Sequence, residues 1–166
     1  GYSRAIKASR AKARALLKEA GAEGLEFSFN NRGVDQPYKV VGTWLVDQWR
    51  KVGFKPRQRV QPSPQFYATL RKKRDFDVSI DFNCQSVINP IADVTKSLCS
   101  AGNNYSQCEN KELDDLYMTL LKAETEKEQR AIMRVYEKKA LEYAGSSITL
   151  WWYKINPHRS YVKGWS

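Results

Sequence analysis

Two carboxylates, Asp77 and Asp81, lie in the segment DFDVSIDF at residues 75–82. Their spacing places both side chains on the same side of an extended strand. Paired carboxylates can carry out acid–base chemistry, as in glycoside hydrolysis. Acids on a strand more often face solvent or pair with Lys and Arg. A hydrolase that uses Asp77 and Asp81 is therefore kept as an alternative, and we assign no residue a catalytic role.

Three cysteines, Cys84, Cys99 and Cys108, and a lone His158 are the remaining candidates for reactive or metal-binding side chains. Their spacing fits no zinc pattern, and His158 has no neighbouring Cys, Ser or paired acid. We expect no metal site and no cofactor. Cys99 and Cys108 bracket a short polar loop and could form a disulfide in an oxidising compartment, which would leave Cys84 free. The alternative is three ordinary thiols.

Polar side chains follow two expected strands. The candidates for ligand contacts are Asn83, Cys84, Gln85 and Ser86 after the strand at 75–82, and Asn30 and Arg32 after an earlier strand. Open α/β sheets hold ligands in loops beyond the carboxyl ends of their strands. Asn83 and Gln85 both donate and accept hydrogen bonds, which suits a neutral polar ligand. The alternative is a loop that satisfies its own backbone.

An aromatic run near the C-terminal end offers a further contact. Trp151, Trp152 and Tyr153 are consecutive on an expected strand, so their side chains must alternate between its faces. Trp151 could line a cleft and stack on a sugar ring or another planar group. The alternative is that both tryptophans pack beneath helices.

The elements that would position these residues alternate between strands and helices. The first half predicts a helix at 9–20 between Ser9 and Gly21, then a strand and a polar loop at 30–37. A helix at 38–52 and a strand at 54–60 complete a βαβ unit, so its strands should be parallel neighbours. The strand is indicated by Leu25, Phe27 and Phe29, which alternate with polar residues. The buried face of the helix is expected at Val41, Trp44, Leu45 and Val52.

The second half continues the alternation. Ser63 should cap a helix that ends near Arg74, and the strand at 75–82 follows. Asn89 should cap a short helix, and Thr125 with Glu128 forms a capping box for a long one. The apolar helical stripes are Leu113, Leu116, Tyr117, Leu120 and Leu121, then Ile132, Met133, Tyr136, Ala140 and Tyr143, before a last strand at 147–153. The fold class is therefore α/β, a small mixed sheet with helices on both faces.

The chain carries 28 basic and 18 acidic residues, a formal net charge of +10. Such charge raises the possibility of nucleic acid or an anionic surface as a partner. The basic residues crowd near the N-terminal end and are elsewhere interleaved with acids, and no nucleic-acid-binding signature stands out. We expect no nucleic-acid partner, and a basic domain that binds nucleic acid or an anionic surface remains an alternative. No apolar run approaches the ~18 residues needed to span a bilayer.

Several segments in order resemble one lobe of bacterial ABC-transporter solute-binding proteins, in the large peptide-, nickel- and oligosaccharide-binding group. They are AKARALLKEAG at 11–21, LVDQWRKVGFKPRQRV at 45–60, FDVSIDF at 76–82, NYSQCENKELDDL at 104–116, ITLWWYK at 148–154 and VKGW at 162–165. In that family two lobes close around a solute, which a membrane permease then receives.

The resemblance implies a type II-like periplasmic binding lobe without enzymatic activity. Residues 1–8 would be a hinge remnant, 9–150 a single ligand-binding lobe, and 151–166 an exit strand and return to the hinge. The implied partners are a small-molecule or peptide-like solute, a second lobe missing from this chain and an ABC permease. The implied location is periplasmic, or extracellular and membrane-associated.

The sequence departs from the family pattern at one position. Peptide-binding members carry an acidic residue shortly before an Asp-Pro-like step, where it pairs with the ligand's amino terminus. Here the step is Asn89-Pro90, and Ser86 stands at the matching place. The expected ligand is therefore less cationic, such as a sugar, an opine-like amide or another small polar solute.

Overall fold

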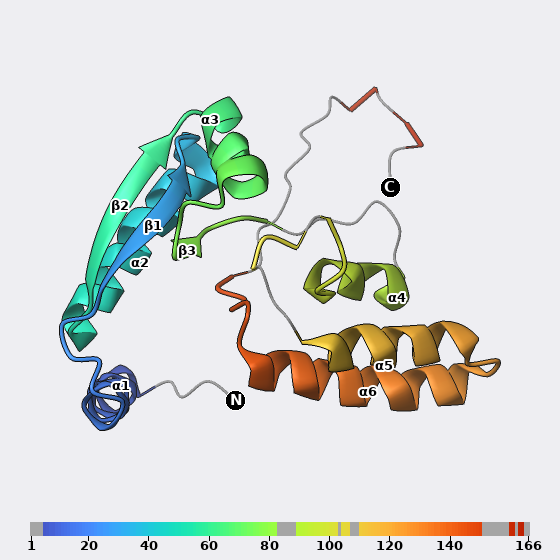
Figure 1. Cartoon of the computed structure of the whole chain (residues 1–166). Coiled ribbons are helices and arrows are strands. Elements are labelled where there is room, and N and C mark those ends of the chain that lie inside the picture. Colours follow the sequence, from blue (N-terminus) through green and yellow to red (C-terminus); the bar gives the residue numbers. More distant parts are fainter. Residues whose placement is uncertain are drawn as a thin grey trace.

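A computed structural model of the chain describes residues 5–82, 89–102, 104–106, 110–150, 160–161 and 163–164. Its strands are β1 (Glu26–Arg32), β2 (Lys55–Gln61) and β3 (Val78–Ser79). They form one sheet in the order β2-β1-β3, and both pairings are parallel (Figure 1). The sheet is therefore parallel over the described residues instead of mixed, while the α/β class is confirmed. The boundary expected at 151 falls outside the described residues.

The βαβ unit is confirmed. β1 and β2 pair in register from Glu26 with Lys55 to Arg32 with Gln61. The connecting helix α2 (Val40–Val52) ends at Gly53, whose φ of 112° is a left-handed conformation that glycine adopts without strain. It is preceded by a turn of π-helix, Asp35–Lys39. Helix α1 covers Ile6–Glu19, so it begins three residues before the expected cap, Ser9.

One face of the sheet packs on α2 around Phe29 and Gly42. Phe29 is 1 % exposed, and its ring lies 5.0 Å from that of Trp49 in an edge contact. The buried positions of α2 are Gly42 and Val46, whereas Trp44, expected to be buried, is 57 % exposed. The close approach of Gly42 to β1 sets the rotation of the helix, and this turns Trp44 away from the sheet.

The opposite face is covered by α3 (Ser63–Ala68), which continues as a π-helical turn, Thr69–Lys73. Phe66 and Leu70 in this segment are fully buried. Helices therefore lie on both faces of the sheet, as expected. Ser63 is the first residue of the helix and does not cap it; its hydroxyl instead accepts a hydrogen bond from Arg32.

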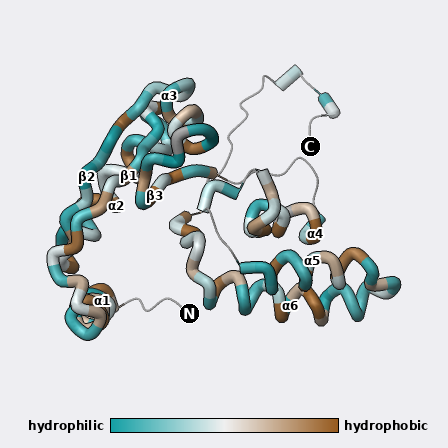
Figure 2. The backbone as a smooth tube through the Cα atoms, in the orientation of Figure 1, coloured by the Kyte–Doolittle hydropathy of each residue, from teal (hydrophilic) through white to brown (hydrophobic). Residues whose placement is uncertain are grey.

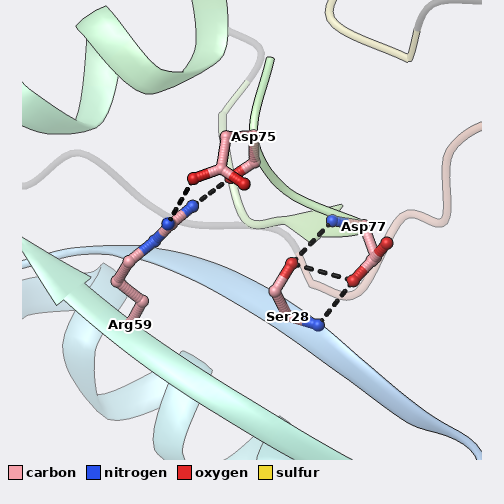
Figure 3. A network of polar contacts seen from close by, with 4 residues as sticks. All are labelled: Ser28, Arg59, Asp75 and Asp77. Atoms are coloured by element: carbon pink, nitrogen blue, oxygen red, sulfur yellow. Dashed lines mark hydrogen bonds and ion pairs between the residues drawn. The ribbon is translucent and has the colours of Figure 1, made fainter. Parts of the chain in front are cut away.

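The strand expected at 75–82 is ladder-paired only at Val78–Ser79. The Asp77 carboxylate accepts the backbone N–H of Ser28 at 2.7 Å and its hydroxyl at 2.8 Å, and the backbone N–H of Asp77 donates to the Ser28 hydroxyl (Figure 3). A side chain therefore takes the place of a backbone partner at Ser28. Arg59 in β2 forms a second link by pairing with Asp75 at 2.8 Å.

Replacing Asp77 with asparagine should weaken this link between β3 and β1. The bonds from Ser28 lower the pKa of the Asp77 carboxyl below its ordinary value. Such a group stabilises the folded state above its unfolded pKa, and the stabilisation disappears as the pH falls through the lower folded pKa. We expect Asp77→Asn to cost about 1 kcal/mol near neutral pH, and the difference from wild type to shrink under acid conditions.

Chemical denaturation at a series of pH values measures this difference. Asp35→Asn is the matched control, because the pair that Asp35 forms with Lys39 within the described part of the chain is exposed and lies in the next helical turn. A cost for Asp77→Asn that did not change down to acid pH would contradict the prediction.

The second half of the described chain is helical, with α4 (Pro90–Asp93), a 3-10 turn at Val94–Ser97, α5 (Lys111–Lys122) and α6 (Glu126–Tyr143). Helices α5 and α6 lie side by side, with α4 along the pair (Figure 1). Hydrophobic and hydrophilic residues alternate along both long helices (Figure 2), as in amphipathic helices. The cap at Asn89 and the capping box at Thr125 and Glu128 are confirmed.

Tyr136 is the centre of the helical core, packed with Leu98 and Leu113. Burial raises the pKa of its phenol to about 12. Two members of the expected stripes are exposed, Leu121 at 52 % and Tyr143 at 42 %, because the stripes are wider than the surface that a single partner helix covers.

Helix α6 is followed by Ala144 in a left-handed conformation, and residues 147–150 form no strand. The last strand is therefore wrong over those residues, which are exposed and have no described strand beside them; 151–153 lie outside the described residues. Among the described helices, none combines the length and the apolar character needed to cross a bilayer.

Cys99 is disulfide-bonded. Its backbone N–H donates to Asp114 at 2.9 Å, and the backbone N–H of Asn110 donates to its sulfur at 3.2 Å. The other two cysteines, Cys84 and Cys108, lie outside the described residues. The expected pairing of Cys99 with Cys108 therefore stays a prediction, consistent with the closeness of Cys99 to Asn110.

Candidate functional site

The sheet face opposite α2 is polar from one end to the other. Phe29 and Asn31 of β1 face Gly42, so Ser28, Asn30 and Arg32 point to the other side. Because the ladder is in register, the neighbouring segments add polar residues to the same face. They are Arg57, Arg59 and Gln61 in β2, and Asp77, Ser79 and Asp81 in and around β3. Parallel sheets are usually apolar on both faces, so this polar face is unusual and is a candidate binding surface.

The same face holds the buried polar atoms that have no hydrogen-bond partner within the described part of the chain. They are both amide atoms of Asn30, Nε of Arg59, Oε1 of Gln61 and Oδ1 of Asp81. An unpaired buried polar group costs roughly 1–3 kcal/mol. A polar partner would therefore contribute most free energy at these positions.

Arg32 is held firmly at the carboxyl end of β1. Its Nε donates to the Ser63 hydroxyl at 2.8 Å, and its Nη1 lies 3.4 Å from the Tyr67 hydroxyl. The rings of Tyr38 and Tyr67 lie 5.2 and 5.3 Å from the guanidinium carbon, within the range of cation–π attraction. Side chains from two elements, α3 and the turn at Asp35–Lys39, thus fix one guanidinium at the carboxyl end of the strands, where open sheets bind ligands.

Further aromatic and basic groups surround this guanidinium. Arg71 lies over the Tyr67 ring at 5.1 Å and donates from Nε to the Tyr105 hydroxyl at 3.3 Å. Tyr38 packs against Phe82, with ring centres 6.0 Å apart. Burial raises the pKa of the Tyr38 phenol, although the charge of Arg32 opposes this. We call Arg32, Tyr38, Tyr67 and Arg71 the Arg32 cluster.

The two acids considered for catalysis have structural partners. Asp81 pairs with Lys96 at 3.1 Å, and Lys96 also contacts the Phe82 carbonyl and ring. Asp77 is bound to Ser28 and has a lowered pKa. General acid catalysis by a carboxyl group is favoured by the opposite shift, so the lowered pKa does not favour Asp77 as a proton donor. Within the described residues no group of His, Cys, Asp and Glu could hold a metal ion.

The predicted site residues are placed as follows. Asn30 and Arg32 lie in β1 and not in a loop beyond it, because the strand extends to Arg32. Asn30 is completely buried, whereas Arg32 is partly exposed at the sheet edge. Asn83, Cys84, Gln85, Ser86 and Trp151 lie outside the described residues, so their roles stay predictions.

The sequence reasoning missed Tyr38, Tyr67, Arg71 and Lys96. The separation of Tyr67 and Arg71 by four residues within one helix was a usable signal, because such residues face each other. Nothing local indicated that Arg32 would meet Tyr38 and Tyr67, since this depends on how the turn at 35–39 and helix α3 return to the end of β1.

Comparison with known proteins gave matches only among solved structures. No protein-family model matches the chain, and no curated protein does. A periplasmic murein tripeptide-binding protein, MppA, in its unliganded open form, is 19 % identical with a TM-score of 0.73; the match covers 82 % of this chain and 27 % of MppA. DppA, an ABC transporter-associated periplasmic binding protein from Helicobacter pylori in complex with the peptide STSA, is 16 % identical with a TM-score of 0.67, covering 81 % and 27 %.

A third match is MelB, a periplasmic binding protein from Agrobacterium fabrum in complex with stachyose. It is 14 % identical with a TM-score of 0.61, and the match covers 83 % of this chain and 24 % of MelB. The chain therefore has the fold found in part of the periplasmic solute-binding proteins of ABC transporters, and it spans about a quarter of their length. All three of these similar proteins are named as binding proteins.

Proposed function

We propose that the chain is a ligand-binding lobe that captures a small solute for an ABC importer. The observation that carries the proposal is the Arg32 guanidinium, which Ser63, Tyr38 and Tyr67 hold at the carboxyl end of a strand in a parallel sheet. A fixed polar group at this end of the strands is what a binding site requires. The fold shared with solute-binding proteins supports the same function.

The wider assignment follows from the same fold. A second lobe would close over the polar edge, a permease would receive the solute, and the protein would work in the periplasm or at the outer surface of the membrane. The role is binding without chemical change of the solute. The disulfide-bonded state of Cys99 supports an oxidising compartment.

Nuclear magnetic resonance titration of the chain with the peptide STSA and with stachyose tests this function. We expect at least one of them to cause saturable shifts of the backbone amides at Arg32, Gln61 and Ser63, and to be recovered unchanged. Binding should be weak, because contacts made on closure of a second lobe are missing. Failure of both solutes and of the anionic probe described below to shift these amides, or chemical conversion of a bound solute, would overturn the proposal.

A further inference from the structure

Positive charge gathers around the Tyr67 ring. Arg32 and Arg71 both lie over it, with guanidinium carbons 5.3 and 5.1 Å from the ring centre. The carboxylate of Asp81 acts electrostatically on both Tyr38 and Arg71, which places it in the same neighbourhood. Lys96 already neutralises Asp81 at 3.1 Å. The cations here outnumber the carboxylates among the described residues, so the edge carries net positive charge.

Among the residues that the structure describes, no acid pairs with Arg32 or Arg71, whereas other arginines do form such pairs. Arg57 pairs with Glu26, Arg59 with Asp75, and Arg130 with Glu126. Within the described residues, Arg32 and Arg71 bond only to hydroxyl groups. A hydroxyl positions a guanidinium without cancelling its charge. These two cations are therefore fixed and still available to an anion.

The donors that remain on Arg32 suit a carboxylate. Its Nε–H is used by Ser63, and one Nη1 hydrogen points to Tyr67. The Tyr38 phenol takes part in a further hydrogen bond with the guanidinium, and the other hydrogens of Nη1 and Nη2 have no partner among the described residues. Adjacent guanidinium donors bind the two oxygens of a carboxylate with good geometry. Because the Tyr38 and Tyr67 rings already hold the guanidinium, little side-chain entropy is lost on binding.

We propose that the solute bound at this edge is an anion, whose carboxylate binds Arg32 while Arg71 adds positive charge beside it. This rests on the proposed solute-binding function and narrows it to a chemical class. The site then recognises the charge of the solute, in addition to the neutral hydrogen bonds expected from Asn83 and Gln85. A cationic solute is rejected by the same positive charge.

The test uses three probes of similar length and different charge: glutarate, its neutral diamide glutaramide, and the dication cadaverine. Each is titrated into the chain at low salt while the Nε–H resonance of Arg32 is followed. We expect glutarate to give saturable shifts that weaken as salt is raised, because ion pairs at an exposed edge are screened. We expect glutaramide and cadaverine to give none.

Two variants test how much each arginine contributes to glutarate binding. Arg32→Gln should weaken glutarate binding at least tenfold, which corresponds to about 1.4 kcal/mol. Arg71→Gln should weaken it less, about threefold, because Arg71 contributes field and not the forked contact. Arg134→Gln is the matched control, since Arg134 is an exposed arginine on α6 and the substitution changes net charge equally. Its binding should match wild type, and backbone spectra of all variants establish that they fold.

The outcomes separate this inference from the proposed function. Equal binding of glutarate and glutaramide, or binding of cadaverine, would overturn the anion class and leave solute binding in place. An Arg134→Gln effect as large as that of Arg32→Gln would show general charge attraction and would also overturn it. Saturable binding of stachyose with no glutarate binding would overturn only the anion class. Absence of binding by STSA, stachyose and glutarate alike would remove both proposals.

Discussion

Gly42→Ala should destabilise the βαβ unit strongly, although alanine is the better helix former. A Cβ atom at this position would lie 1.5 Å from Oδ1 of Asn31 and 3.2 Å from the Phe29 ring. Asn31 is completely buried, and its Nδ2 donates to the backbone carbonyl of Arg32, so the side chain has no room to withdraw. Helix α2 must then move away from β1, which opens the core around Phe29.

We expect a loss of about 3 kcal/mol, at the upper end for an overpacked core site. For a chain of this size that corresponds to a drop in Tm of roughly 10 °C. Thermal and denaturant unfolding measure it, with Thr43→Ala as the control, because Thr43 is the next residue of the same helix and is exposed. A Gly42→Ala protein as stable as wild type would mean that α2 does not approach β1 at this residue.

The second large effect is expected in the helical half, at Tyr136. Its side chain is 1 % exposed and packs with Leu98 and Leu113, and its hydroxyl donates to the backbone carbonyl of Val94 at 3.2 Å. Truncation to alanine removes a large buried ring and leaves a cavity. We expect Tyr136→Ala to cost about 3–5 kcal/mol, whereas Tyr136→Phe should cost about 1 kcal/mol for the lost hydrogen bond.

The neighbouring residue gives the matched control. Val135 is 48 % exposed on the same helix, so Val135→Ala should change stability by less than about 0.5 kcal/mol. Far-ultraviolet circular dichroism during denaturation follows the loss of α5 and α6. If Tyr136→Ala and Val135→Ala unfolded at the same denaturant concentration, Tyr136 would not be the centre of this core.

The proposed anion binding also relates the basic composition of the chain to its fold. The chain is basic overall, and the sequence by itself left open whether this charge serves nucleic acid, an anionic surface or nothing specific. The structure shows that Arg57 and Arg59 of the sheet pair with acids, while the two arginines near Tyr67 are held by hydroxyls. Whether a cation is available to a ligand depends on the groups beside it and not on the net charge of the chain.

The sequence determined much of the local structure. Three local features were predicted and confirmed: the end of a helix before Gly53, the cap at Asn89 and the capping box at Thr125. Each depends on residues within a few positions of one another. The parallel pairing of β1 with β2 followed from the length of the helix between them. Of the candidate site, Arg32 was named, but as a loop residue beyond the strand.

The tertiary structure decided what these elements do to one another. Trp44 was expected in the core and is exposed, because the contact of Gly42 with Asn31 fixes the rotation of α2. The strand at 75–82 shortened to Val78–Ser79, because the Asp77 side chain occupies the backbone donor of Ser28. Local periodicity carries no record of such distant partners.

The Arg32 cluster shows the same division between what the sequence determines and what the tertiary structure decides. Its members are spread over residues 32–71, and only Tyr67 and Arg71 share a helix. Their meeting requires β1, the turn before α2 and helix α3 to converge at one end of the sheet. The amino-acid sequence fixes which groups can be charged or aromatic. Whether a charge is neutralised by an acid or kept available by a hydroxyl depends on distances that exist only in the folded chain.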